Sequence, residues 1–278
     1  MTPAPLPAEQ AALLRAIVAE PNEDTPRLVY ADWLQEGGDE EQARYVRDSV
    51  RLAATPHDAP GRKALAERLR ETRDWRGPEW LQRLGLGKRA VGFERGLPVR
   101  VVFEGANEFF AVADRLFALL PVRALEICAY SGTRLRGDAV RRLAAMPELA
   151  RLTDLRFVGH EPIDPNAWRA LFRSPRASGL TFLGLSGCHV GAVIATQLAA
   201  APRLANLTDL DLSYNDIGVF GARALLDSPH LLKLRRLWLE GNFRARADGE
   251  DALAADLELR LGPGLHLHDS PADDEEEL

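Results

Sequence analysis

The sequence has 278 residues, of which 46% are hydrophobic and 27% charged. This length allows two ordinary domains or one long one, and the composition is typical of a soluble globular protein. The formal net charge is -6, but six of the 41 acidic residues lie within the last ten positions, so 35 basic and 35 acidic side chains balance in the rest of the chain. This balance argues against a general surface for nucleic acid or an acidic membrane.

Residues 1–86 contain no repeat and predict helices that are joined by turns. Apolar side chains recur at helical spacing within residues 8–20. Thr25 followed by Pro26 predicts a helix start with Thr25 as the N-cap, and Gly37 with Gly38 predicts its end. Asp39 and Gln42 form a capping-box pattern for a third helix, and residues 61–84 predict a fourth.

Residues 22–39 read Asn-Glu-Asp-Thr-Pro-Arg-Leu-Val-Tyr-Ala-Asp-Trp-Leu-Gln-Glu-Gly-Gly-Asp. This stretch resembles the repeat-companion domain, a short N-terminal module found ahead of leucine-rich repeats in planctomycete bacteria, and the resemblance covers about residues 9–53. It implies a small helical module that is paired with a repeat domain, and it brings no known activity or catalytic residue. Trp33 and Leu34 are expected to pack in the helical core, with Asp32 at the surface or in a local hydrogen bond. The alternative is that residues 30–33 form a docking surface.

Five later segments share the pattern apolar-x-x-apolar-x-apolar, which alternates as a β-strand does. The second apolar positions are 30, 28, 27 and 27 residues apart. Internal repeats of this length indicate a stack of similar structural units. These second positions are Leu125, Leu155, Leu183, Leu210 and Leu237.

The position three residues after each strand pattern holds Tyr130, His160, Cys188, Asn215 or Asn242. Asn and Cys at this position match the leucine-rich-repeat consensus. The chain turns inward there, so backbone N–H and C=O groups need partners, and a buried Asn amide pairs with both kinds. We therefore expect Cys188, Asn215 and Asn242 to form a structural ladder.

A helical stretch follows each strand pattern, and repeats of 27–30 residues are similar to the ribonuclease-inhibitor-like class of leucine-rich repeats over residues 122–242. The predicted fold is an α/β leucine-rich-repeat solenoid, with parallel strands inside and helices outside, preceded by a small all-α module. A strand at 99–103 with a helix at 108–120, and a helix at 250–261 with a strand at 264–267, are expected to cap its ends. The predicted domains are residues 1–86, residues 87–268 and a disordered acidic tail at 269–278.

The residues between the leucines are expected to face outward on the concave side of the sheet. They combine charge with aromatic rings that we expect to be exposed, and Trp and Arg are enriched at binding hot spots. The alternative is that neighbouring charges only balance each other and that aromatic rings pack on adjacent strands. The candidate partner-binding residues are Trp238, Phe182, Arg156, Asp211, Glu126 and Arg236.

The sequence predicts no catalytic residue, no metal site and no cofactor. The glycines at 184, 187 and 191 lie between a strand and a helix, but their spacing differs from G-x-G-x-x-G. His266 and His268 lack the further ligands that a metal site needs. A nucleotide-binding enzyme using the loop from Gly184 to Gly191 and a self-associating structural protein stay open as alternatives.

The favoured function is a non-catalytic adaptor that binds a protein partner and neither nucleic acid nor membrane. Residues 177–202 carry no charge, but polar residues, glycines and prolines interrupt them, so we expect no membrane span. No secretory signal is recognisable, and two cysteines make no disulfide framework. We therefore expect a cytoplasmic protein.

Overall fold

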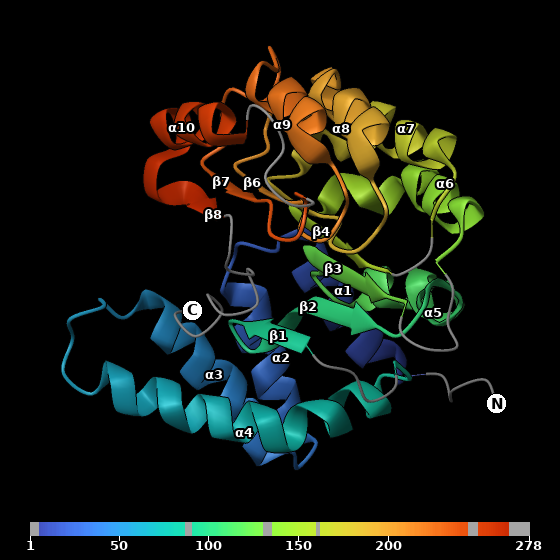
Figure 1. The fold of residues 1–278 in the computed structure, drawn as a ribbon. Coiled ribbons are helices and arrows are strands. Elements are labelled where there is room, and N and C mark those ends of the chain that lie inside the picture. The colour runs from blue at the N-terminus through green and yellow to red at the C-terminus, as the bar shows by residue number, and fades with distance from the viewer. Residues whose placement is uncertain (1–5, 87–90, 130–134, 160–161, 244–249, 267–278) are drawn as a thin grey trace. The chain divides into compact units, whose positions relative to one another are not determined.

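The computed structural model describes residues 6–86, 91–129, 135–159, 162–243 and 250–266. The protein is α/β, with helices and a mostly parallel sheet (Figure 1). It divides into two compact units: Met1–Val102 with Phe110–Arg123, and Phe103–Phe109 with Ala124–Leu278. Tyr130, His160, His268 and the acidic tail lie outside the described residues.

The first unit begins with four helices. They are α1 (Ala8–Ala19), α2 (Thr25–Glu36), α3 (Glu40–Ala54) and α4 (Arg62–Arg83). The expectation that Thr25 is an N-cap is wrong by one residue, because Asp24 already has helical dihedral angles and Thr25 is the first helical residue. The expected cap of α3 is confirmed, since the Asp39 carboxylate accepts a hydrogen bond of 3.1 Å from the Gln42 N–H.

An aromatic cluster joins these helices to a hairpin in the same unit. Strands β1 (Val91–Glu94) and β2 (Leu97–Phe103) are antiparallel, and α5 (Ala106–Leu119) follows. The Tyr45 and Trp80 ring centroids are 4.9 Å apart, and Phe93 of β1 lies 5.9 Å from Tyr45. The core of this unit therefore draws on the hairpin as well as on the helices.

The second unit contains parallel strands that are neighbours in chain order. They pair in register, so that Leu125, Leu155, Leu183, Leu210 and Leu237 form one buried row across the sheet. The strand positions predicted by aligning the repeats are thus confirmed as a parallel sheet. The strands are β3 (Ala124–Cys128), β4 (Asp154–Val158), β5 (Phe182–Gly184), β6 (Asp209–Asp211), β7 (Arg236–Trp238) and β8 (Leu265–His266).

A helix follows each of the strands β3 to β7 and lies on one side of the sheet (Figure 1). Three of these helices end two or three residues before a proline that begins a short 3-10 turn, and these turns are η1 (Pro147–Arg151), η2 (Pro175–Gly179) and η3 (Pro202–Leu204). The helices are α6 (Gly137–Ala145), α7 (Pro165–Arg173), α8 (Gly191–Ala199), α9 (Gly218–Leu226) and α10 (Glu250–Leu261).

Two buried asparagines pair the backbone where the chain turns after β6 and β7. The Asn215 amide nitrogen donates to the carbonyls of Leu185, Leu212 and Ser213 at 2.7–2.8 Å, and its oxygen accepts from the Val190 N–H. The Asn242 oxygen accepts from the N–H groups of Asn215 and Ile217 at 3.1 Å. Each amide therefore binds its own turn to the preceding one.

Cys188 occupies the equivalent position after β5 and makes weaker bonds. Its thiol donates to the carbonyls of Phe157 and Ser186 at 3.4 and 3.5 Å. Burial raises the pKa of this thiol, so it stays protonated and behaves as a small apolar group with one weak donor.

We predict that Asn215→Ala lowers the free energy of unfolding by about 2–4 kcal/mol, because it leaves the Val190 N–H and several buried carbonyls short of a partner. Cys188→Ala is the comparison, with an expected loss of about 1 kcal/mol. Urea denaturation of the two variants and the wild type measures both. Equal losses would show that the asparagine amide is no more important than the thiol.

Candidate functional site

The strand side chains that alternate with the leucines form a continuous network over β4 to β7. At one end, the Arg156 guanidinium pairs with the Asp154 carboxylate at 3.1 Å and lies 4.1 Å above the centre of the Phe182 ring. At the other end, Arg236 pairs with Asp209 and lies 5.5 Å from the centre of the Trp238 ring. The Phe182 and Trp238 centroids are 5.9 Å apart and link the two ends.

A glycine in the middle strand makes room for this stacking. Gly184 lies between Arg156 and Asp211 in the strand register. A Cβ atom there would lie 3.2 Å from both Arg156 Cγ and a Phe182 ring carbon. Any larger residue would therefore have to push the guanidinium and the ring apart.

The expectation that Trp238 is an exposed aromatic is wrong, because its exposed fraction is 1%. Phe182 and Trp238 belong to strands on either side of β6, and their rings meet across it. The β6 residues Asp209 and Asp211 are buried as well. Trp238 and Asp211 are therefore buried members of this network, whereas Arg236 keeps half of its side chain exposed.

Asp211 is an acidic residue whose side chain is buried. Burial raises the pKa of its carboxyl group, while the Ser213 N–H, which donates at 2.9 Å, and the nearby Arg156 charge act in the opposite direction. Glu240 raises this pKa further through like charge. Glu126 is half-buried at the β3 end of the face, where the Cys128 thiol donates to it at 3.1 Å.

The loop from Gly184 to Gly191 uses its backbone donors within the fold. The N–H groups of Leu185, Gly187 and Gly191 donate to carbonyls of the next repeat, at Asp211, Ser213 and Asn215. Those of Cys188 and Val190 donate to Leu185 O and to the Asn215 side chain. These five donors are therefore not directed at a bound phosphate.

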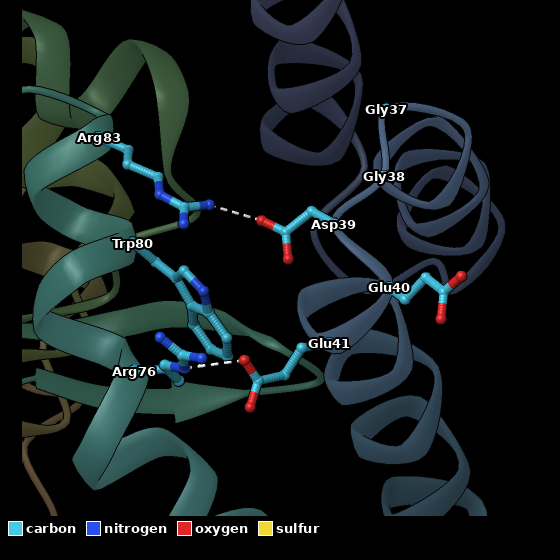
Figure 2. Close-up of a pocket in the computed structure, with 8 residues that line it drawn as sticks. All are labelled: Gly37, Gly38, Asp39, Glu40, Glu41, Arg76, Trp80 and Arg83. Atoms are coloured by element: carbon cyan, nitrogen blue, oxygen red, sulfur yellow. Dashed lines mark hydrogen bonds and ion pairs between the residues drawn. The ribbon is translucent and has the colours of Figure 1, made fainter.

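A separate pocket of about 470 Å³ lies in the first unit, at the turn between α2 and α3. Figure 2 shows Asp39 directed toward Arg83 and Glu41 toward Arg76, with Trp80 between the two pairs. The distances between the paired atoms are 2.6 and 2.8 Å. No local sequence pattern predicts this pocket, because its walls lie more than thirty residues apart in the chain. The one signal in the sequence is the Gly37-Gly38 turn before Asp39.

Segment 30–33 is divided between core and surface. Tyr30 is buried, and its hydroxyl accepts a hydrogen bond from Gln10 at 3.2 Å. Trp33 is half-buried and donates to Glu9, while the exposed Asp32 pairs with Arg47 at 2.7 Å. Its polar groups thus have partners within the unit.

No protein-family model matches the sequence, and no curated protein matches it either. Within the described ranges, no helix is long and apolar enough to cross a membrane. The same part of the chain holds no group of three or more His, Cys, Asp or Glu side chains placed to bind a metal ion.

We predict that Asp211→Asn raises the melting temperature at pH 7. The folded state raises the pKa of Asp211, so ionisation of this group opposes folding above that pKa and has no effect below the pKa of the unfolded chain. Asn keeps an oxygen for the Ser213 N–H but carries no charge. The gain should shrink as the pH falls toward 3, which thermal unfolding from pH 7 to pH 3 measures.

Asp164→Asn is the control with the opposite sign. The Asn166 N–H and Arg141 hold the pKa of the Asp164 carboxyl group below its ordinary value, so its charge favours folding at pH 7 and this contribution is lost as the pH falls. This variant should lower the melting temperature at pH 7. If Asp211→Asn also lowers it, burial does not dominate at Asp211.

We predict that Trp80→Ala lowers the free energy of unfolding by about 3–5 kcal/mol, because this buried ring fills the core beneath the pocket of Figure 2. Arg83→Ala should cost at most about 1 kcal/mol, because its pair with Asp39 is half exposed to solvent. Chemical denaturation separates the two. A large loss for Arg83→Ala would show that the ion pairs hold the pocket in shape.

Proposed function

We propose that the second unit is a short solenoid of the ribonuclease-inhibitor-like leucine-rich-repeat class, and that the first unit contains a repeat-companion module. The in-register strands at 27–30-residue intervals, the helices that follow them and the asparagine bonds support the first assignment. Residues 22–39, which carry the resemblance, form α2 and the turn into α3.

On this assignment the protein is a non-catalytic adaptor that binds a protein partner on its strand face. The observation that carries the proposal is the preformed network from Arg156 through Phe182 and Trp238 to Arg236. Side chains already held in one arrangement lose little entropy on binding, and Arg and aromatic residues dominate binding hot spots. Arg236, Phe182 and Glu126 are the reachable members of this face, and Trp238 and Asp211 hold it in shape.

The backbone of one loop favours this proposal over a nucleotide-binding enzyme, and the two cysteines bear on the cellular location. The loop from Gly184 to Gly191 directs five backbone donors into its own fold, whereas phosphate-binding loops present such donors to the ligand. Cys128 and Cys188 are both buried thiols that form no disulfide. Free thiols are compatible with the reducing cytoplasm in which we place the protein.

The test is an affinity capture from native extract of the source cells with the wild-type chain and Arg236→Glu as baits. Reversing this half-exposed charge should reduce the retained partner at least tenfold, because an interfacial charge of the wrong sign costs more than about 1.4 kcal/mol. Quantitative mass spectrometry of the retained proteins measures the change.

Arg235→Glu is the matched control. Arg235 is also exposed, but it precedes β7 and lies outside the strand face. A partner retained by the wild type and by Arg235→Glu but lost by Arg236→Glu supports the proposal. Loss with both variants would indicate non-specific charge attraction, and retention by both would place binding elsewhere.

A further inference from the structure

A cavity of about 440 Å³ opens on the helical side of the second unit, away from the strand network. Its walls come from α7, α8 and the turn η3, which pack against one another. All three elements belong to the same compact unit. The lining residues that matter for its chemistry are Arg169, Phe172, Arg173, Thr196, Gln197 and Arg203.

Three arginines surround this cavity. Arg169 and Arg173 are four residues apart and share one face of α7, and Arg203 reaches it from η3. All three are exposed, and none pairs with an acidic side chain within the described residues. The described lining also contains no Asp or Glu. Three arginines thus line one small volume whose described lining holds no counter-charge.

Other arginines of the second unit do form ion pairs with acidic side chains. Arg141 pairs with Asp164, Arg223 with Asp256, and Arg236 with Asp209. A bound anion would supply the three arginines of the cavity with a counter-charge. Guanidinium groups also match the geometry of phosphate oxygens, to which they donate two parallel hydrogen bonds.

The rest of the cavity suits the organic part of a small molecule. Buried Phe172 and Ala201 and exposed Pro202 give it apolar walls. Gln197 also lines the cavity, and its side-chain amide can exchange hydrogen bonds with a ligand hydroxyl. The volume falls in the range of about 300–1,000 Å³ that is usual for small-molecule sites.

We propose that this cavity binds a small hydroxyl-bearing phosphate ester. Arg169, Arg173 and Arg203 hold the phosphate group, and Phe172, Pro202 and Gln197 contact the organic part. The site is independent of protein binding on the strand face, because it lies on the opposite side of the repeats and shares no residue with that network.

The test is isothermal titration calorimetry of the full chain with glycerol 3-phosphate and with glycerol, at low and high salt. Glycerol 3-phosphate should bind and glycerol should not, and binding should weaken at least tenfold at high salt, as screening of the charges requires. Arg173→Gln should weaken binding about tenfold, and the triple variant Arg169→Gln, Arg173→Gln, Arg203→Gln should abolish it.

The matched control is the triple variant Arg15→Gln, Arg70→Gln, Arg235→Gln, which removes three exposed arginines outside the cavity. It has the same net charge and should bind as the wild type does. Circular dichroism verifies that each variant is folded. The proposal is overturned if the wild type does not bind at millimolar ligand, if the cavity variant still binds, or if the control loses binding equally. Binding of a poly-glutamate peptide but not of the phosphate ester would also overturn it, in favour of an acidic protein segment.

Discussion

The strand arrangement of the second unit depends on one constraint. The backbone groups inside the turns that follow the strands must form hydrogen bonds. Each such turn brings N–H and C=O groups into the interior, where an unpaired group costs about 1–3 kcal/mol. Asn215 reaches back to Leu185 O and Val190 N, and Asn242 reaches back to the N–H groups of Asn215 and Ile217. One side chain thereby fixes two successive turns, so the spacing and register of the strands follow from these amides.

The strand network is a consequence of that fixed register. Because β5, β6 and β7 pair residue for residue, Phe182 and Trp238 come from strands on either side of β6 and their ring centroids lie 5.9 Å apart. The arrangement buries Asp211 at a cost that its raised pKa reveals. Because the pKa is raised, ionisation of Asp211 opposes folding, and a neutral residue at this position would favour the folded state.

The sequence alone predicted the strands closely, because the period-2 leucines and the 27-residue spacing reflect one repeated packing solution. It placed β3 to β7 at their residues and in the right pairing. The sequence did not predict that Trp238 is buried. Alternation shows on which face of the sheet a side chain lies, but it does not show that the Phe182 ring, two strands away, packs against Trp238. It also missed the pocket beside Asp39, because no local pattern shows that Arg83 comes within 2.6 Å of it.

Charge is also hard to place from the sequence, because a total charge does not show which charged side chains lie together in the fold. Apart from the last ten residues the chain has 35 basic and 35 acidic side chains, and this balance argues against a general surface for nucleic acid or an acidic membrane. On the strand side the balance holds locally, since Arg156 and Arg236 each meet an aspartate. On the helical side it does not, because Arg169, Arg173 and Arg203 line a cavity whose described lining has no acidic residue. Electrostatic attraction for a ligand depends on charges within about 10 Å, the screening length at 0.1 M salt, so a neutral total is compatible with a strongly positive pocket.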